Sequence, residues 1–464
     1  MFFRLIFLLL VDALLALAGL HSAVVLRFGY NQAIERFSDS SEILISSVFV
    51  VAAIFSSQLM DVYDFSKITR KREVFINILM GASSTFFMLS IVYYLNPNVM
   101  LGRGVLFLSL CLFAIFQLLS HSLYLINYKH PRFSKKALVL GTGPLAAQIG
   151  TIASSHKHNY TLAGYASSNS NGTSANEYGQ SNLAVPPDEI IGNAEDLLAT
   201  TIKAQADVIV IALSERRGTF PLGEVLRCKM NGIEVVDAPS FYEQILAKLM
   251  LENMTPSWII FSSGFNKSNL FSLLKRGMDI VLSLVGLVLA APIAPLIALA
   301  IKLDSPGPVL FKQVRVGNME KLFTLYKFRT MRQDAEAQTG AVWSEKNDPR
   351  VTRLGLVLRN TRIDEIPQLF NVLKGEMSFI GPRPERPEFV EKLKQVIPFY
   401  SKRHFIKPGL TGWAQVRYPY GSSVEDAIEK LRYDLYYLKN ISPFLDLLIF
   451  FETIKVVLFG RGGR

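Results

Sequence analysis

The stretch RNTRIDEIPQLFNVLKGEMSFIGPRP (359–384) carries the most information about this chain of 464 residues. Two adjacent carboxylates, Asp364 and Glu365, stand just before a proline. Proline is favoured at the first position of a helix, so we expect a short helix over about 367–373. Lys374-Gly375 then provides a C-terminal helix signal. The two carboxylates are therefore expected at a helix N-terminus, where free N–H groups and the helix dipole favour anions.

Three arginines of the same stretch flank the carboxylates in sequence: Arg359, Arg362 and Arg383. Cations beside a carboxylate pair suit a divalent metal together with a phosphate group. Aspartate is also a known covalent nucleophile toward phosphoryl groups. The plainer alternative is a pair of solvated charges at the start of a helix, and the stretch alone leaves it open.

Composition limits the class of protein. The length predicts two or three domains, and the hydrophobic content of 50% is high for a soluble chain. The net charge of +11 suits nucleic acid or anionic lipid, and four long apolar runs favour lipid, so no nucleic-acid partner is predicted. Cys111 and Cys228 lie far apart and the six histidines lack ligand spacing, which argues against a disulfide framework and a zinc site.

Residues 1–130 predict a four-helix transmembrane bundle, with apolar segments at about 5–26, 42–60, 74–95 and 103–126. The bundle might belong to a transporter, but we identify no ionisable residue in the middle of a segment and therefore predict no transport pathway. Cations concentrate in the second loop and after the fourth segment, which predicts that both ends of the bundle are cytoplasmic. These cations are Lys67, Arg70, Lys71, Arg72, Lys129, Arg132, Lys135 and Lys136.

Residues 131–250 predict a cytoplasmic α/β domain of Rossmann-like (CoA-binding-like) type. An apolar strand leads into Gly141, Gly143 and Ala146, the G-x-G-x-x-A form of a nucleotide-binding turn. Two serines follow the second strand where an acidic residue would bind a ribose, so the glycines could serve strand–helix packing alone. Further strands are expected at 161–166, 207–213 and 232–236, which implies a parallel sheet.

Residues 251–270 read as a linker, followed by a hydrophobic helix over 275–302. Pro292 and Pro295 interrupt its apolar run at 280–301, and each removes a backbone hydrogen bond. A full crossing would export everything after it, including the phosphate-binding arginines. A bend at Ala291-Pro292 would instead return the chain to the cytoplasm, so we expect a re-entrant helix, with a fifth full span as the open alternative.

Residues 303–464 are basic and rich in short motifs. In LYKFRTM (325–331), Lys327 and Arg329 alternate on an expected strand, so both should face one anionic groove. Gly409 and Gly412 suggest a close backbone approach to a ligand. The apolar closing segment, 443–459, could lie in the bilayer interface or form a core helix.

Residues 271–464 resemble the bacterial sugar transferase family, the monotopic phosphoglycosyl transferases. The resemblance runs in order through KRGMDI, FKQVRVG, YKFRTM, RIDEIPQLFNVLKGEMSFIGPRPE, KPGLTGWAQV and YDLYYLKNIS. The preceding bundle and Rossmann-like domain resemble the large members that prime exopolysaccharide synthesis. The PERPEFV run and the closing GRGGR are similar to the subfamily associated with the exosortase/PEP-CTERM system.

The resemblance implies an α/β monotopic catalytic domain on the cytoplasmic face of the bacterial inner membrane. It implies transfer of a sugar-1-phosphate from a UDP-sugar to undecaprenyl phosphate, with UMP as second product, Mg²⁺ as cofactor and an aspartyl phosphosugar intermediate in a ping-pong scheme. Asp364 matches the nucleophile and a metal ligand, and Glu365 its dyad partner. Ala291-Pro292 stands where relatives have Ser-Pro at the helix break. The implied substrate-binding residues are Lys327, Arg329, Arg359, Arg383 and Asp434.

Two other functions stay open. The protein could be a non-catalytic membrane scaffold of a polysaccharide export complex, although every expected polar residue is present. It could also modify nucleotide sugars with its Rossmann-like domain, but the one Tyr-x-x-x-Lys pair, Tyr63–Lys67, lies in a membrane loop. The transferred sugar and the oligomeric state, a homodimer being one option, are not predicted.

Overall fold

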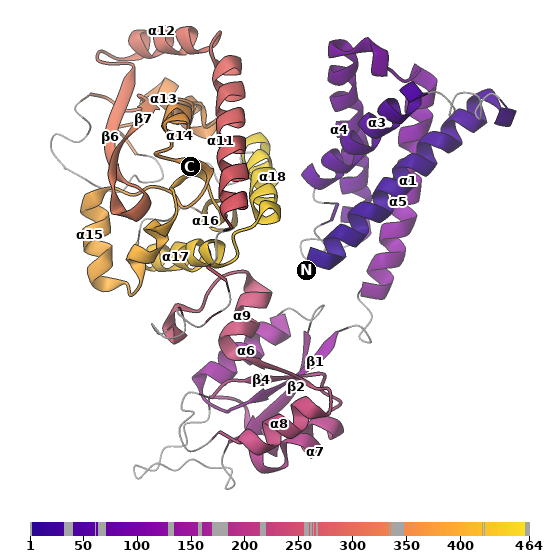
Figure 1. The fold of residues 1–464 in the computed structure, drawn as a ribbon, viewed down its shortest axis with the longest axis vertical. Coiled ribbons are helices and arrows are strands. Elements are labelled where there is room, and N and C mark those ends of the chain that lie inside the picture. The colour runs from indigo at the N-terminus through magenta and orange to yellow at the C-terminus, as the bar shows by residue number, and fades with distance from the viewer. Residues whose placement is uncertain are drawn as a thin grey trace. The chain divides into compact units, whose positions relative to one another are not determined.

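The computed structural model describes residues 2–31, 40–60, 62–63, 71–128, 134–155, 160–168, 184–213, 220–254, 259, 262, 264–265, 268–333, 335, 348–419, 421 and 423–459. The chain divides into two compact units, Met1–Ser134 and Lys135–Arg464 (Figure 1). The closing GRGGR and Lys67 of the Tyr63–Lys67 pair lie outside the described residues.

The first unit is a bundle of apolar helices, as predicted. Its elements are α1 (Phe2–Phe28), α3 (Ser40–Leu59), α4 (Lys71–Leu95), η1 (Pro97–Val99) and α5 (Arg103–Tyr128). Within the described residues, each of the four α-helices contains a stretch long and apolar enough to cross a membrane. The orientation of the bundle relative to the membrane stays a prediction. It depends on the loop cations, and several of these lie outside the described residues: Lys67, Arg70, Lys129 and Arg132.

A buried polar cluster lies inside this bundle, which corrects the expectation that no ionisable residue occurs within a segment. Asp12 of α1 is fully buried and accepts a hydrogen bond from Gln117 Nε2 of α5 at 2.5 Å. His121, one turn further along α5, lies 3.2 Å from both oxygens of the Asp12 carboxylate. Gln117 also donates to Ser57 of α3 at 3.2 Å. The cluster therefore joins three helices through polar contacts. Ionisable residues inside an apolar bundle need such partners, because an unpaired charge is costly to bury there.

Replacing the carboxylate of this cluster should destabilise the bundle. Asp12→Leu removes the acceptor shared by Gln117 and His121 and leaves both side chains buried. We expect a loss of about 2 kcal/mol in the free energy of unfolding. Thermal unfolding in detergent measures this, with Ser47→Ala as the control because the Ser47 hydroxyl is exposed and bonds only within α3. Equal melting temperatures for the two variants would contradict the assignment.

The second unit begins with a parallel five-stranded sheet of order β3-β2-β1-β4-β5, which confirms the predicted parallel sheet. Side chains of β1 alternate between two buried clusters, one shared with α6 and α9 and the other with α7 and α8, so helices cover both faces. The strand β3 had no counterpart in the prediction. The elements are β1 (Lys135–Leu140), α6 (Pro144–Ser155), β2 (Tyr160–Ser167), η3 (Pro187–Glu189), β3 (Ile190–Asn193), η4 (Ala194–Asp196), α7 (Leu197–Lys203), β4 (Val208–Ile211), α8 (Leu222–Met230), β5 (Glu234–Asp237) and α9 (Ala238–Leu246).

The predicted glycine turn lies between β1 and α6. Gly141 has a φ of 128°, and a Cβ there would come within 2.5 Å of the Ala212 carbonyl oxygen. Ala146 of α6 is fully buried in the apolar cluster that α6 and α9 form with the sheet. Packing within the unit therefore accounts for glycine at 141 and alanine at 146.

The rest of the unit contains the short motifs of the C-terminal sequence, together with an antiparallel ribbon of β6 and β7 (Figure 1). Its elements are η5 (Leu251–Asn253), α11 (Asn269–Ala290), α12 (Ala294–Asp304), β6 (Leu310–Val316), η6 (Asn318–Glu320), β7 (Leu322–Phe328), α13 (Arg353–Asn360), η7 (Ile363–Glu365), α14 (Gln368–Lys374), β8 (Ser378–Ile380), α15 (Pro387–Val396), η8 (Tyr400–Phe405), β9 (Gly409–Thr411), α16 (Trp413–Arg417), α17 (Val424–Lys439) and α18 (Pro443–Phe459).

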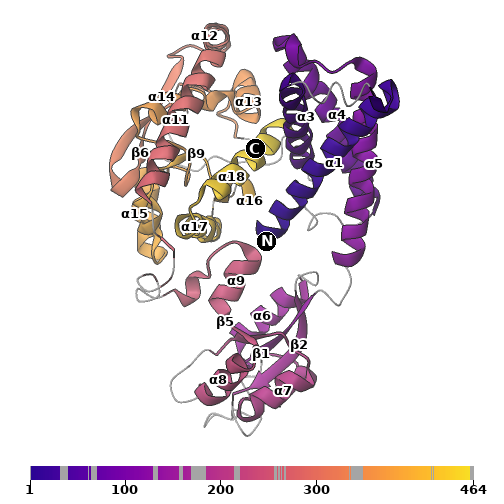
Figure 2. The same ribbon diagram turned by 45° about the vertical axis from the view of Figure 1, so that its right-hand side comes forward.

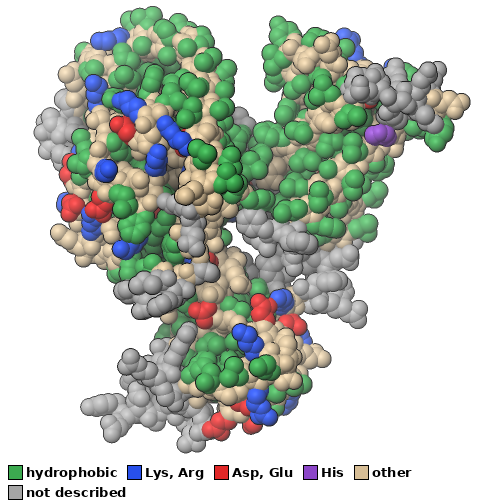
Figure 3. Space-filling model, in the orientation of Figure 1, with side chains coloured by type: hydrophobic (Ala, Val, Ile, Leu, Met, Phe, Trp, Pro, Cys, Tyr) green, Lys and Arg blue, Asp and Glu red, His purple; other side chains and the backbone are tan. Residues whose placement is uncertain are grey.

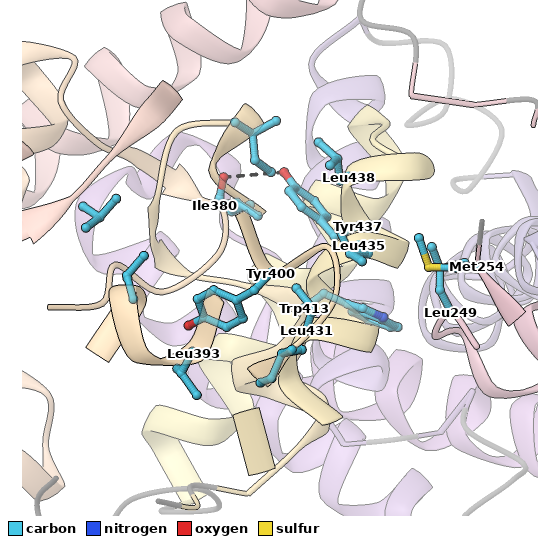
Figure 4. Close-up of a cluster of buried hydrophobic side chains, with 14 of the residues drawn as sticks. Leu249, Met254, Ile380, Leu393, Tyr400, Trp413, Leu431, Leu435, Tyr437 and Leu438 are labelled. Carbon is cyan, nitrogen blue, oxygen red and sulfur yellow. Dashed lines mark hydrogen bonds between the residues drawn. The ribbon is translucent and has the colours of Figure 1, made fainter. Parts of the chain in front are cut away.

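A buried apolar cluster joins β6, β8, α15, η8, α16, α17 and α18 (Figure 4). Tyr400, Trp413 and Tyr437 lie within it and are each at most 3% exposed. Leu249 and Met254 also belong to the cluster, so the segment that precedes and begins the predicted linker packs into this core. Helix α18 buries Leu445 and Ile449 in the same cluster, and this face matches the core-helix alternative.

The hydrophobic helix is bent where the prolines predicted. Helices α11 and α12 meet at 63° across a break of three residues that includes Ala291 and Pro292. The outer surface of both helices is apolar and exposed, with Val288 71% exposed on α11 and Leu296 66% exposed on α12. Figure 3 shows hydrophobic side chains covering this part of the molecule, with Lys and Arg side chains gathered beside them.

The inner face of α11 is polar and fixes the helix to the rest of the unit. Lys275 donates to Asp446 of α18 at 2.6 Å, and Arg276 donates to the carbonyls of Val372 and Leu373 at the end of α14. Asp279 accepts from the Ser378 hydroxyl at 3.0 Å and from the Phe379 N–H at 2.8 Å. The KRGMDI motif therefore anchors a helix whose other face is left apolar.

Candidate active site

The carboxylate pair lies in a short 3₁₀ turn, η7, that leads into α14. Arg362 precedes the turn in a left-handed conformation with a φ of 59°, which redirects the chain after α13. Gly375, with a φ of 84°, ends α14, as predicted from the Lys-Gly signal. Asp364 and Glu365 are 6% and 7% exposed. The predicted helix is confirmed, and the carboxylates lie in the turn before it.

Glu365 is ionised in its buried position because cations surround it. Its Oε1 atom lies 3.2 Å from Lys327 Nζ, 3.1 Å from Arg383 and 3.7 Å from Arg362. Burial raises the pKa of Glu365, but the charges of Lys327, Arg383 and Arg362 outweigh that effect and hold the pKa well below its usual range. The carboxylate therefore links the strand β7 to the Gly-Pro-Arg-Pro segment at 381–384.

Asp364 has a different environment. Among the residues that the structure describes, no hydrogen bond or ion pair engages its carboxylate, although it lines the same cavity as Glu365. Burial raises the pKa of Asp364 and the Glu365 charge adds to this, while Lys327 and Arg359 act in the opposite direction. Asp364 is therefore buried without a hydrogen-bond partner among the described residues, whereas Glu365 is bonded to cations, so the two neighbours have different chemical environments.

The pair lies in a cavity of ≈ 580 Å³ whose wall is strongly cationic. Ten of the lining residues are Lys or Arg and three are Asp or Glu, so the cavity suits a polyanionic ligand. The lining comes from β6, β7, α13, η7, the 381–386 segment and α15. The cationic lining residues are Lys312, Arg315, Lys327, Arg329, Arg332, Arg350, Arg359, Arg362, Arg383 and Arg386.

The structure brings Lys327, Arg359 and Arg383 to this cavity beside the carboxylates. Arg359 donates through Nε to the Thr330 hydroxyl at 2.9 Å, which orients its guanidinium. Sequence analysis thus grouped residues that lie up to 56 positions apart, from 327 to 383, in one site.

Arg329 differs from Lys327, because β7 ends at Phe328 and the two do not alternate on one strand. Its guanidinium is directed toward the end of α12, where it donates to the Pro306 carbonyl at 2.9 Å and the Ser305 carbonyl at 2.6 Å. Although Arg329 reaches the cavity wall, these bonds make it a clamp on the turn that follows the bent helix.

Asp434 is not among the residues that line the cavity. It is 1% exposed and accepts from Arg403 Nε at 3.0 Å. Arg403 donates in turn to the Tyr400 hydroxyl at 2.8 Å and to the Arg383 carbonyl at 3.1 Å. Asp434 is therefore connected to the backbone of Arg383 through Arg403. Sequence analysis missed Arg403, because no pattern distinguishes it from the other cations of SKRHF.

Glycines shape the loop that carries Arg383. A Cβ on Gly409 would lie 2.1 Å from the Gly381 nitrogen, and a Cβ on Gly412 would lie 2.1 Å from the Gly381 oxygen. We expected Gly409 and Gly412 to allow a close approach to a ligand. The structure shows instead that both glycines lie against the backbone of Gly381. The parallel pair β8–β9 results from this contact.

A Mg²⁺ ion would find a limited set of ligands here. The described residues contain no group of three or more His, Cys, Asp or Glu side chains that could hold a metal. Mg²⁺ needs only one or two carboxylates when substrate phosphates and water supply the remaining ligands. The Asp364 carboxylate, unengaged among the described residues, fits that requirement, whereas Glu365 is taken up by its three cations.

Comparison with known proteins finds relatives of the C-terminal part of the chain. Residues 270–460 match the family model described as Bacterial sugar transferase. A UDP-N-acetylgalactosamine-undecaprenyl-phosphate N-acetylgalactosaminephosphotransferase of Aeromonas hydrophila is 43% identical over 51% of this chain and 55% of its own length. An undecaprenyl-phosphate glucose phosphotransferase of Komagataeibacter xylinus is 34% identical over 72% and 60%. The exopolysaccharide production protein PSS of Rhizobium leguminosarum bv. phaseoli is 46% identical over 39% of this chain and 93% of its own length.

A buried carboxylate pair in a cationic cavity, beside a bent apolar helix, defines a membrane-associated protein with an anion-binding site. The chain belongs to the bacterial sugar transferase family. The matched stretch spans between half and two thirds of the length of the first two relatives.

The link between Asp434 and Arg403 can be tested by stability. Asp434→Asn keeps the shape of the side chain but leaves the buried Arg403 charge uncompensated. We expect a loss of about 3 kcal/mol in the free energy of unfolding, measured by denaturant titration. Glu224→Gln is the control, since its partner Arg227 is 70% exposed and the exposed pair should contribute less than about 1 kcal/mol. Similar losses in the two variants would contradict the assigned role.

Proposed function

We propose that the protein is a phosphoglycosyl transferase that moves a sugar-1-phosphate from a UDP-sugar to undecaprenyl phosphate. The observation that carries this proposal is the contrast within the carboxylate pair. Glu365 is paired with three cations, whereas Asp364, next to it, is desolvated and unengaged among the described residues. The names of the A. hydrophila and K. xylinus relatives support the choice of lipid acceptor, and the former supports a UDP-sugar donor.

The reaction proceeds in two displacements at one phosphorus. An Asp364 oxygen attacks the sugar-bearing phosphorus, the bond to the bridging oxygen breaks, and UMP leaves with that electron pair. An oxygen of undecaprenyl phosphate then attacks the same phosphorus, and the aspartyl oxygen leaves as carboxylate. No net proton transfer is needed. Two steps let a soluble nucleotide and a membrane lipid use one site in turn.

The cations of the cavity offset the charge that would otherwise repel a carboxylate from a diphosphate. Lys327 and Arg383 are held in place by Glu365, and Arg359 by the Thr330 hydroxyl. Fixed donors of this kind stabilise charge as it develops on the leaving phosphate. A Mg²⁺ ion held by Asp364 and the diphosphate would supply further charge neutralisation.

The bent helix gives the proposed membrane arrangement. We infer that α11 and α12 enter one leaflet and return, because their outer surfaces are apolar and exposed while α11 is anchored by its polar face. The cavity then lies at the cytoplasmic surface of the bacterial inner membrane, where UDP-sugars and the lipid phosphate both have access. The parallel sheet at 135–237 shares the strand order of Rossmann-like folds, and we assign it a regulatory or stabilising role.

The nucleophile is tested directly by Asp364→Asn. An amide cannot form the acyl phosphate, so UMP release should fall by at least roughly a thousandfold. Intact-mass measurement after incubation with UDP-sugar alone should show a phosphosugar adduct on the unaltered protein and none on the variant. Asp304→Asn, at an exposed carboxylate on α12, should keep both activity and adduct. Rapid turnover by Asp364→Asn would refute the mechanism.

The cofactor is tested by chelation. Activity should vanish in EDTA and return with Mg²⁺ or Mn²⁺, because a diphosphate and one carboxylate are hard oxygen ligands. The measurement is UMP release from membranes before and after metal is restored. Full activity in chelator would show that the cavity cations alone neutralise the diphosphate.

A further inference from the structure

Two buried carboxylates hold cations of the cavity wall. The first is Glu365, which is paired with three of them. The second is Asp348, whose side chain is 3% exposed and accepts from Arg350 Nε at 2.8 Å and from a terminal nitrogen of Arg350 at 2.6 Å. Arg350 lines the cavity and Asp348 does not, so the carboxylate lies behind the wall. Two parallel bonds of this kind fix the plane of a guanidinium.

A second arginine, Arg332, lies directly opposite Arg350. Met331 and Val351 form an antiparallel bridge, and the Arg332 N–H donates to the Arg350 carbonyl at 3.1 Å. Both arginines line the cavity. Arg332 is exposed, and its side chain makes no hydrogen bond or ion pair within the described part of the chain. Like charges directly opposite each other destabilise a strand pair, so this arrangement favours a bound anion.

A third arginine connects this pair with the reacting carboxylate. The hydrogen bonds from Arg350 outweigh burial and lower the pKa of Asp348 to about 2, and the charge of Arg359 contributes to this effect. The charge of Arg359 also opposes the rise in the pKa of Asp364. Arg359 is therefore within electrostatic reach of both carboxylates. Three arginines near Asp348 leave an excess of positive charge, which a phosphate group would neutralise.

The arginine pair lies in the sequence just before a helix that contacts the bent one. The Thr352 hydroxyl accepts from the Gly355 N–H and so begins α13. Leu358 of α13 and Ile301 of α12 belong to one buried apolar cluster. Figures 1 and 2 both show α13 and α12 at the same end of the C-terminal part of the chain. A phosphate site here is compatible with a lipid whose chain lies along the exposed apolar surface of α12.

The chemistry of a double displacement requires one phosphate position that two substrates use in turn. In each in-line step the attacking and leaving atoms stand on opposite sides of the phosphorus. Asp364 occupies one side in both steps, so UMP leaves from the side on which the lipid phosphate later attacks. The phosphate of UMP and the phosphate of the lipid therefore occupy the same position, next to the phosphoryl group that is transferred.

We propose that Arg332 and Arg350 form this shared phosphate position and that Asp348 is a positioning residue, which orients Arg350 for it. This inference rests on the proposed function. The ligand is the phosphate of UMP in the first displacement and the phosphate of the polyprenyl lipid in the second. Lys327 and Arg383, which Glu365 holds, are then left to bind the phosphoryl group that carries the sugar.

The test measures the two half-reactions separately. Arg332→Gln and Arg350→Gln are assayed for kcat/KM with UDP-sugar, for kcat/KM with undecaprenyl phosphate, and for inhibition of labelled-sugar transfer by UMP. The donor is whichever of UDP-glucose, UDP-galactose, UDP-N-acetylglucosamine and UDP-N-acetylgalactosamine gives the fastest UMP release. Both values of kcat/KM should fall by about tenfold or more, and UMP should inhibit correspondingly less, because each quantity depends on the same charged hydrogen bonds. Arg353→Gln, at an exposed arginine of α13 outside the cavity lining, is the matched control and should change none of them.

The role of Asp348 is tested by a double-mutant cycle. Asp348→Asn should lower both values of kcat/KM, and the variant that combines it with Arg350→Gln should be no worse than Arg350→Gln alone, because Asp348 acts through Arg350. Additive losses would mean that Asp348 stabilises the fold without orienting Arg350. If Asp348→Asn does not fold, Arg332→Gln still decides whether the position binds phosphate, since that side chain is exposed.

Three results would overturn the shared position. A loss confined to UDP-sugar would mean that the arginines bind a donor phosphate that the lipid does not replace. A loss confined to undecaprenyl phosphate would mean that they bind the lipid alone. Unchanged values for both substrates and for UMP would mean that they bind neither. Absence of UMP release from the unaltered protein with every donor would instead refute the proposed function itself.

Discussion

The cavity depends on one buried charge. Glu365 is ionised away from water because Lys327, Arg362 and Arg383 surround it. The same pairing connects the ribbon, the turn before α14 and the Gly-Pro-Arg-Pro segment. Burial raises the pKa of the neighbouring Asp364 carboxyl, and the charge of Glu365 adds to this rise. Glu365 is engaged by the surrounding cations, whereas no hydrogen bond or ion pair engages Asp364 among the residues that the structure describes.

The bent helix is also attached to the rest of the unit through buried polar contacts. Lys275, Arg276 and Asp279 satisfy buried groups on α14, α18 and β8, so the polar face of α11 is fully used by the protein. Its apolar face is then available to lipid without cost. Arg329 donates to the Ser305 and Pro306 carbonyls just after α12, so the end of the bent helix is attached to the cavity wall as well.

Much of this arrangement could be predicted from sequence because it rests on local signals. The apolar periods of the bundle, the prolines of the bent helix and the Lys-Gly end of α14 each act over a few residues. What escaped prediction depends on contacts between distant segments. Lys327 and Arg329 both reach the cavity, as expected, but the strand stops at Phe328 and the Arg329 guanidinium bonds to the turn after α12. Asp434 was identified as functional, yet its partner Arg403 and its indirect action are visible only in three dimensions. Asp12 and His121 are visible in the sequence inside apolar segments, but their pairing appears only when α1 and α5 pack together.

The contact among Gly381, Gly409 and Gly412 has an evolutionary consequence. Backbone meets backbone there with no room for a Cβ on any of the three residues. A side chain on one segment cannot be accommodated by a compensating change on the other, because glycine is already the smallest residue. The two segments, 378–384 and 407–412, must therefore be inherited together. A recombination event that exchanged one of them with a distant relative would succeed only where the incoming segment brought its glycine at the matching position.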